Sequence, residues 1–235
     1  MNSKILLSIV FSFLFQFVFA QFKQNDTLFF VREVSADVYH AVFIDSNKHS
    51  AFYNYVSDFT IPEYKKYTYE RSIDYLCLKK LPMKKRRVYP LPEEWVMLES
   101  YKGNRYVNSP NDYYSHYKMK LTDSVLIHWD GEGPQATYIN QFNNIDSNTF
   151  QFSMQSIWSP KIILTIKYLD KAKGVAVFRF NYYNIGDKKM QTYFQLMCEV
   201  KKMRNIPLLV NYSDTEKSYE LDFDIIDYSK YFKIK

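Results

Sequence analysis

The side chains with the most chemical potential lie at residues 127–134, Ile-His-Trp-Asp-Gly-Glu-Gly-Pro. If this segment is a strand, His128 and Asp130 share one face about 7 Å apart, and such a pair can supply two ligands to a metal ion. His116 has the same parity, but a metal site needs three or four converging ligands, and the spacing offers no convincing third. The glycines and the proline that follow are typical of a turn. We therefore interpret the segment mainly as a strand that runs into a turn.

Spacing also argues against two kinds of catalytic site. Along an extended strand Ser124 and His128 are about 13 Å apart, whereas a nucleophile and its base must approach to about 3 Å. The chain has no Gly-x-Ser-x-Gly segment, the usual setting of a hydrolase serine. Carboxylate pairs such as Asp130 with Glu132 are common on surfaces and do not define a glycosidase cleft. We predict no catalytic residue, no metal and no cofactor, and rank a metal-dependent or glycoside hydrolase third among the possible functions.

The first twenty residues have the layout of a secretory signal peptide. Lys4 supplies the positive charge, residues 5–19 are almost wholly apolar, and Val18-Phe19-Ala20 is a small-residue cleavage pattern. The alternative is a membrane anchor, but a spanning helix needs about 20 apolar residues, and this run is shorter and contains Gln16. We therefore predict cleavage after Ala20 and a secreted or periplasmic protein with no transmembrane anchor.

The charges of the chain are modest in sum and spread along its length. Its 31 Lys and Arg and 25 Asp and Glu give a net charge of +6, which favours solubility and gives no reason to expect a nucleic-acid partner. The densest basic run, Lys84 to Arg87, lies among prolines in residues 79–92 and is typical of a solvated linker, with polyanion binding as the alternative. The five glycines each fall where a periodic segment ends, so they mark turns.

Cys77 and Cys198 are the two cysteines of the chain. In an oxidising compartment they can form one disulfide, which would close a long loop and stabilise the fold by about 4–5 kcal/mol. Alternatively both are buried free thiols, because cysteine packs like a small apolar residue. The sequence leaves these two alternatives open. It contains no Cys-x-x-Cys segment, which argues against zinc ribbons and thioredoxin-like sites.

Most of the chain after residue 93 alternates apolar and polar residues with period two, as half-buried antiparallel strands do. Residues 117–130 show this alternation, but Asp123 interrupts the apolar positions, so a turn at residues 122–124 is expected to divide two strands. The count reaches about eight strands between Glu94 and Met203, the number that closes a small up-and-down barrel. The later predicted strands are residues 135–142, 149–155, 162–168, 176–182 and 192–200.

The first part of the chain has a less regular pattern. Residues 61–71, with Pro62 near their start, predict a short helix. Residues 92–94 fit either the first turn of a helix or the start of a strand. The segments with the composition of strands are residues 28–34, 38–45, 51–56 and 73–79.

Together these elements predict an all-β protein. An antiparallel meander forms a small up-and-down, lipocalin-like barrel, or a β-sandwich if the sheet does not close, and a β-rich N-terminal part precedes it. The likeness to lipocalins is one of architecture, because Trp95 follows Glu94 and does not form the Gly-x-Trp of that family. The expected division is a signal peptide (1–20), an N-terminal β-rich region (21–90), the barrel or sandwich domain (91–210) and a C-terminal segment (211–235).

Tyrosines occur in clusters that can form a ligand surface, because the ring is apolar and its hydroxyl can hydrogen-bond. We predict a non-catalytic binding protein whose barrel mouth holds a small apolar or glycan ligand. The alternative is an envelope structural or interaction protein that meets another protein through a tyrosine-rich face. An apolar cavity would favour the first, and a filled interior with a flat aromatic patch the second. The candidate ligand-binding residues are Tyr113, Tyr114, His116, His128, Trp129, Asp130, Tyr182 and Tyr183.

Overall fold

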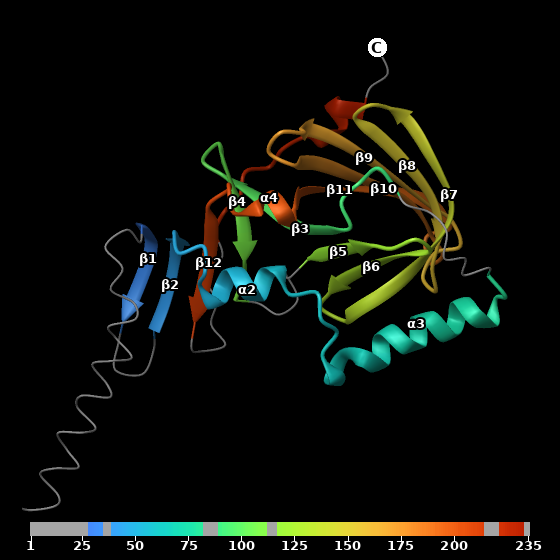
Figure 1. Cartoon of the computed structure of the whole chain (residues 1–235), viewed down its shortest axis with the longest axis horizontal. Coiled ribbons are helices and arrows are strands. Elements are labelled where there is room, and N and C mark those ends of the chain that lie inside the picture. The colour runs from blue at the N-terminus through green and yellow to red at the C-terminus, as the bar shows by residue number, and fades with distance from the viewer. Residues whose placement is uncertain (1–27, 35–38, 82–88, 112–116, 214–220, 233–235) are drawn as a thin grey trace, which may run out of the picture.

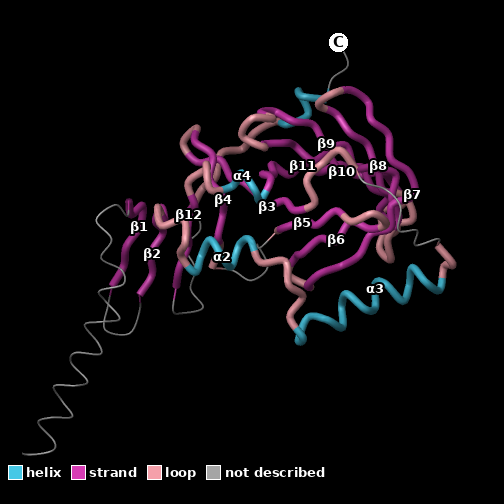
Figure 2. Tube along the Cα trace, viewed as in Figure 1, coloured by secondary structure: helices cyan, strands magenta, loops and turns pink. Residues whose placement is uncertain are grey.

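A computed structural model of the chain describes residues 28–34, 39–81, 89–111, 117–213 and 221–232. These residues form a mostly β structure with a few helices (Figures 1 and 2). The strands are β1 (Leu28–Val34), β2 (Tyr39–Asp45), β3 (Glu94–Tyr101), β4 (Asn104–Ser109), β5 (Lys118–Leu121), β6 (Val125–Asp130), β7 (Gly133–Asp146), β8 (Thr149–Gln155), β9 (Ile162–Asp170), β10 (Val175–Asn184), β11 (Lys189–Glu199) and β12 (Leu208–Ser213). The helices are α2 (Ala51–Ser57), η1 (Glu63–Lys65), α3 (Lys66–Leu78), α4 (Val200–Met203) and η3 (Tyr228–Phe232).

Eight of the strands close into an antiparallel barrel. From β5 to β11, consecutive strands pair with one another. Strand β3 pairs with both β11 and β5, which closes the ring. All of these pairings are antiparallel, so the barrel strands run up and down in chain order. A barrel of eight strands has an interior that side chains can fill or that can hold one small ligand. The prediction of an up-and-down barrel is confirmed.

A side layer of strands extends the same sheet beyond the barrel. Strand β3 joins the two parts, because its first half pairs within the barrel while Leu98–Tyr101 pairs with β4. Strand β12 lies parallel to β4 and antiparallel to β2, and β1 forms the outer edge. In Figure 1 this layer stands to the left of the barrel. The predicted strands at residues 28–34 and 38–45 are therefore present, as β1 and β2.

Two apolar cores stabilise this arrangement. The first fills the barrel interior, where Phe152, Leu164 and Phe178 have no exposed surface. The second lies between the outer face of the barrel and the side layer, with Leu196 from β11 among its members. Because neighbouring residues of a strand point to opposite faces, strand β11 contributes Met197 to the first core and Leu196 to the second.

Helix α3 covers the outer face of β6 and β7 (Figure 1). Its Leu76 is fully buried and packs in a cluster with Ile127 and Trp129 of β6. The Ser72 hydroxyl accepts a hydrogen bond from the backbone N–H of Ala136 at 2.9 Å. Both faces of β6 are therefore covered, and its apolar odd-numbered residues face the helix, while His128 and its even-numbered neighbours face the barrel interior.

Two segments predicted as strands are helical instead. Residues 51–56 belong to α2, where the Ser50 hydroxyl accepts from the Tyr53 N–H at 3.3 Å and caps the helix. Tyr53 and Val56, three residues apart, are its buried residues, a spacing that fits one side of a helix. Residues 73–79 form the last part of α3 and its C-terminal cap. The sequence pattern there was too short to distinguish a helix from a strand.

The remaining expectations for the first part are met with small shifts. The helix predicted at residues 61–71 is present as η1 followed by the first part of α3, with Pro62 just before η1. Residues 94–101 form a strand, so the alternative of a helix start at residues 92–94 is wrong. The turn predicted at residues 122–124 separates β5 from β6.

Candidate functional site

The barrel is filled at one end and hollow at the other. At the filled end the Trp95 ring contacts Tyr168 and Phe178, with ring centroids 5.8 and 5.0 Å apart. At the other end a cavity of about 310 Å³ opens between the strands. Its lining residues come from β5 to β11 and from the connection between β8 and β9: Met119, Leu126, His128, Thr137, Met154, Ser156, Trp158, Ser159, Ile162, Phe180, Tyr182, Asn184 and Tyr193.

Apolar side chains form the inner part of this cavity. Met119, Leu126 and Met154 are almost completely buried, and they belong to the same core cluster as the filled end of the barrel. Strand pairing places Met119 opposite His128 and Leu121 opposite Leu126, and directly paired residues point to the same side of a sheet. The floor of the cavity is therefore formed by the part of the barrel core that faces the opening.

Aromatic rings form one wall of the cavity. The rings of Phe180 and Tyr193 are stacked, with centroids 4.7 Å apart, and Tyr182 meets Tyr193 edge to face at 5.7 Å. The Tyr182 hydroxyl donates to the Gln191 side chain at 2.5 Å. Although 42% of the surface of Tyr193 is exposed, burial of its hydroxyl raises the pKa of Tyr193, and Tyr182 and the Asp130 carboxylate raise it further. The phenol is thus a neutral group at physiological pH.

The connection between β8 and β9 forms another part of the rim. The Ser156 hydroxyl accepts the backbone N–H groups of Trp158 and Ser159, which shapes a tight loop. The Ser159 hydroxyl in turn lies 2.9 Å from the carbonyl oxygens of Lys161 and Tyr183. Trp158 is 61% exposed, and its indole N–H donates to the Gln135 side chain at 2.6 Å. An exposed indole is therefore held in a fixed orientation beside the cavity.

The structure brings together some of the residues singled out from the sequence and separates others. His128 and Tyr182 line the cavity, and the Asp130 carboxylate lies 3.5 Å from His128 Nε2. Trp129 points the other way and packs against Phe59 beneath α3. Tyr183 follows Tyr182 and so points to the opposite face of β10. Tyr113, Tyr114 and His116 lie outside the described residues.

Several lining residues were not anticipated from the sequence. Trp158 and Ser156 lie in a connection between strands, where periodicity carries no information. Tyr193 has the opposite parity to the even-numbered apolar residues of β11, and those residues face the side layer. A tryptophan within a short polar connection was the available signal for this rim, because large aromatic residues are unusual in turns.

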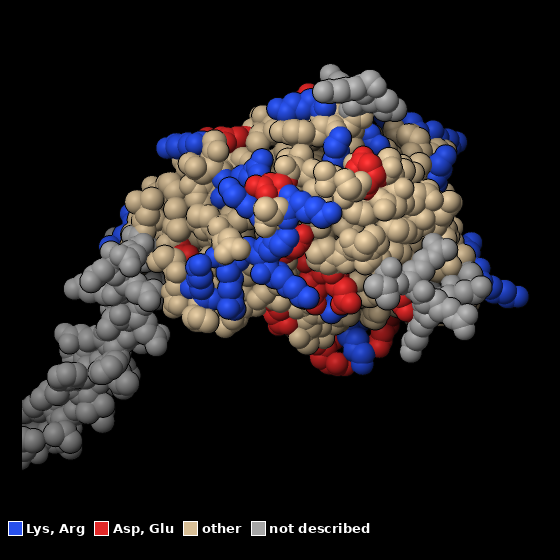
Figure 3. All heavy atoms as spheres, turned by 45° about the horizontal axis from the view of Figure 1, so that its top comes forward, with Lys and Arg blue, Asp and Glu red and all other residues tan. Residues whose placement is uncertain are grey.

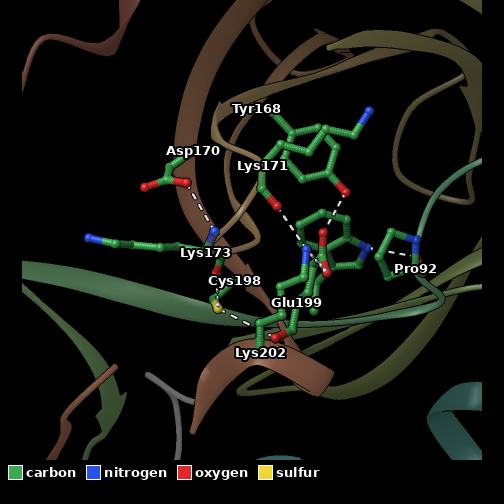
Figure 4. A network of polar contacts seen from close by, with 9 residues as sticks. Pro92, Tyr168, Asp170, Lys171, Lys173, Cys198, Glu199 and Lys202 are labelled. Atoms are coloured by element: carbon green, nitrogen blue, oxygen red, sulfur yellow. Dashed lines mark hydrogen bonds and ion pairs between the residues drawn. The ribbon is translucent and has the colours of Figure 1, made fainter. Parts of the chain in front are cut away.

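A second group of reactive side chains lies at the filled end of the barrel (Figure 4). The buried Glu199 carboxylate accepts from the Tyr168 hydroxyl at 2.8 Å and forms an ion pair with Lys202 at 3.0 Å. Lys202 also donates to the Lys171 carbonyl oxygen at 2.8 Å. Gly174, with φ of +68°, passes so close that a Cβ there would lie 2.9 Å from the Glu199 side chain.

This network is structural in character. Burial raises the pKa of Cys198 to about 12, with the Glu199 charge adding to the effect, so its thiol is a poor nucleophile. Burial and the hydrogen bond to Glu199 also raise the pKa of Tyr168. The network therefore holds one neutral hydroxyl and one ammonium around a buried carboxylate and ties β9, β11 and α4 together.

Both cysteines are free thiols in this structure, so it does not contain the disulfide. Cys77 is exposed on α3, while Cys198 is buried on β11 beneath the side layer. The alternative of two buried free thiols therefore holds for Cys198 but not for the exposed Cys77.

A third site surrounds Lys118 on the outside of the barrel. Its ammonium lies over the rings of Tyr55, Phe59 and Trp129, at 6.0, 5.2 and 5.8 Å from their centroids, and donates to the Asp58 carbonyl oxygen. Burial lowers the pKa of Lys118 to about 8. The space beside it is about 80 Å³, which is too small for most ligands. The contacts fasten the segment after α2 to the barrel.

Glu99 on β3 gives the stability of the protein a pH dependence. Burial raises the pKa of Glu99 from 4.5 to about 7, so folding favours its neutral form. Its contribution to stability is fully present below about pH 4.5 and is lost as the pH rises through about 7. The Glu99→Gln variant should therefore be more stable than the parent near pH 8, by about 1–2 kcal/mol once solvent screening is allowed for.

Urea unfolding at about pH 4 and pH 8 measures this effect. At the lower pH the parent and Glu99→Gln should have similar free energies of unfolding. Glu33→Gln, at an exposed position on β1, is the control and should leave the parent's pH dependence unchanged. A gain from Glu99→Gln that is the same at both pH values would contradict the assignment.

Further comparisons give no independent clue to the site. Within the described ranges, no three His, Cys, Asp or Glu side chains converge to hold a metal ion. None of the helices among the described residues is long and apolar enough to cross a membrane.

Comparisons of the chain with protein-family models, with curated proteins and with solved structures found no match.

Proposed function

We propose that this chain is a secreted or periplasmic binding protein that holds a small apolar or glycan ligand in the mouth of its barrel. The observation that carries the proposal is the cavity of about 310 Å³ above the barrel core. Ligand pockets in proteins range from about 300 to 1,000 Å³ and combine apolar walls with a few polar groups. The cavity is at the lower end of this range, so the ligand is small.

The lining provides both kinds of contact that such a ligand needs. The floor of Met119, Leu126 and Met154 offers an apolar surface, and Thr137 and Asn184 add polar groups to the lining. Trp158 and Tyr193 offer partly exposed rings, and aromatic faces bind both apolar groups and the C–H faces of sugars. These features support a binding site and call for no catalytic group.

Native mass spectrometry of the protein purified from the envelope fraction of its own cell tests the proposal. We expect an additional mass that disappears when the protein is denatured. The denatured mass also reports whether the mature chain begins at Gln21, which tests the secreted or periplasmic location. A bare protein in repeated preparations, with no small molecule bound from a metabolite extract, would contradict the binding function.

Truncating the exposed indole should weaken the site selectively. In Trp158→Ala the ring beside the cavity is lost, and the ligand occupancy seen by native mass spectrometry should fall about tenfold. The melting temperature should change little, because 61% of Trp158 is exposed.

The matched control is Tyr67→Ala, which removes a ring that is 73% exposed on α3. It should leave the ligand occupancy unchanged. If both variants retain full occupancy, Trp158 is not part of the site.

The alternative function is an envelope structural or interaction protein. The observation that favours it is a set of exposed apolar side chains on η1 and α3, namely Tyr64, Tyr67 and Leu78. Exposed apolar patches often mark protein interfaces. Under this alternative the protein would be purified without a small molecule but with a second chain, and Tyr67→Ala rather than Trp158→Ala would release it.

A further inference from the structure

The cavity is unusual for this chain in lacking basic side chains. The protein has 31 Lys and Arg against 25 Asp and Glu, and on the face shown in Figure 3 basic side chains are plentiful, with acidic ones among them. No Lys or Arg is among the described residues that line the cavity. An anionic ligand would therefore find no Lys or Arg to pair with among the described lining residues.

The carboxylate of Asp130 places a negative charge beside a residue that lines the cavity. Asp130 ends β6 at the rim, with its carboxylate 3.5 Å from Nε2 of His128, which lines the cavity. The Asp130 side chain is 25% exposed; it lies beside His128 but is not itself among the described residues that line the cavity. Its charge reaches the hydroxyl of Tyr193 on the aromatic wall, where it raises the pKa of that phenol. Asp130 and the aromatic wall thus act on the same space.

The aromatic wall adds to this negative potential. The rings of Phe180 and Tyr193 are stacked, and Tyr182 meets Tyr193 edge to face. Trp158 also lines the cavity, from the connection between β8 and β9. The face of an aromatic ring attracts a cation, most strongly for tryptophan and tyrosine. Pockets lined by several aromatic rings recognise organic ammonium groups in proteins, and a nearby carboxylate adds a favourable charge.

Resting on the proposed binding function, we propose that the cavity selects a small organic cation, with an ammonium group held among Asp130, Tyr193 and Trp158 and an apolar body directed onto the floor of the cavity. The lack of Lys and Arg disfavours carboxylates and phosphates. The apolar floor disfavours a ligand that is polar throughout, because buried polar groups need partners. An amine with an apolar tail satisfies both conditions.

Three probes of nearly equal shape separate charge from shape. They are 2-phenylethylammonium, 2-phenylethanol and phenylacetate, and their affinities for the full-length protein as purified, freed of bound material by dialysis, are measured by isothermal titration calorimetry. We expect the ammonium to bind about tenfold more tightly than the alcohol, the size of one partly exposed charge and cation–π contact. The carboxylate should bind more weakly than either.

Asp130→Asn tests the role of the carboxylate. The Asp130 side chain accepts the Glu132 N–H at 3.0 Å, and an asparagine can keep this contact, so the turn should be preserved. The variant should lose most of the tenfold preference for the ammonium and keep its affinity for the alcohol. Glu132→Gln makes the same change in net charge two residues away at an exposed position and should retain the preference.

The outcomes distinguish this inference from the binding function itself. Equal affinities for the ammonium and the alcohol would overturn the preference for cations while leaving the cavity a binding site. Tightest binding of phenylacetate would overturn it as well. If no probe binds and no co-purified mass is found, both the preference and the proposed function fail. An Asp130→Asn variant with an undiminished preference would remove Asp130 from the site.

Discussion

Replacing Leu196 by Asp is expected to unfold the protein. Leu196 is 3% exposed and packs in the core between the barrel and the side layer. Truncating a buried leucine costs about 2–5 kcal/mol, and burying an unpaired carboxylate adds several kcal/mol more. The sum is about as large as the whole stability of a typical domain, about 5–15 kcal/mol. Circular dichroism should show the loss of the cooperative thermal transition.

The control for this change is Thr192→Asp, on the same face of the same strand. Thr192 is exposed and hydrogen-bonds to Asn181 at 2.7 Å, so the variant should lose less than about 1 kcal/mol. The pair distinguishes burial beneath the side layer from a general intolerance of β11 to charge. A Leu196→Asp protein that melts within a few degrees of the parent would show that the side layer does not cover this strand.

The barrel could be predicted because its strands carry a regular signal. Residues 162–170, 175–184 and 189–199 alternate strongly and are joined by short turns, so chain order alone indicates their pairing. Strand β3 was less certain, since a helix start and a strand start share the residues Pro92, Glu93 and Glu94. The ring closes through this strand, so the choice between barrel and sandwich depended on its pairing with β5 and β11.

The helices were harder to predict because tertiary contacts determine them. Residues 51–56 contain three aromatic residues and a valine, which have strand-like propensity. The cap from Ser50 and the burial of Tyr53 and Val56 favour a helix instead. The prediction separated residues 73–79 from the preceding helix because of their apolar composition. In the structure Ser72 and Leu76 lie on one side of a single helix, α3. Short apolar segments are ambiguous in this way.

The candidate site could be predicted in part. His128 and Tyr182 have interior parity on their strands and line the cavity. Trp129 was predicted as a ligand-binding residue because it lies between His128 and Asp130. Alternation along the strand places it on the outer face instead, where α3 covers it. Alternation shows that one face of β6 is apolar, but nothing in the sequence indicates that helix α3 covers this face from outside the barrel. Trp158 depends on a loop whose shape follows from hydrogen bonds of Ser156.

Replacing Glu199 by Ala should destabilise the protein strongly without affecting the cavity. The change leaves the Tyr168 hydroxyl without its acceptor and removes the partner of Lys202. Breaking a buried ion pair costs about 3–5 kcal/mol, and partial exposure of Lys202, 33%, reduces this to about 2–4 kcal/mol. Glu199→Gln keeps an oxygen acceptor for Tyr168 and should lose about half as much. Urea unfolding measures both losses, and a loss below about 1 kcal/mol in Glu199→Ala would contradict the structural role.

The same variant tests whether the two ends of the barrel are separable. Glu199 ends β11 at the filled end, and the core around Trp95 and Phe178 lies between it and the cavity. Under conditions where Glu199→Ala is fully folded, its ligand occupancy should equal that of the parent, whereas Trp158→Ala should show the opposite pattern, with stability kept and occupancy lost. A fall in occupancy in Glu199→Ala would mean that the filled end holds the cavity in shape, so that the barrel acts as one unit. Independent effects would mean that the closed end supplies stability and leaves the mouth free to vary with the ligand.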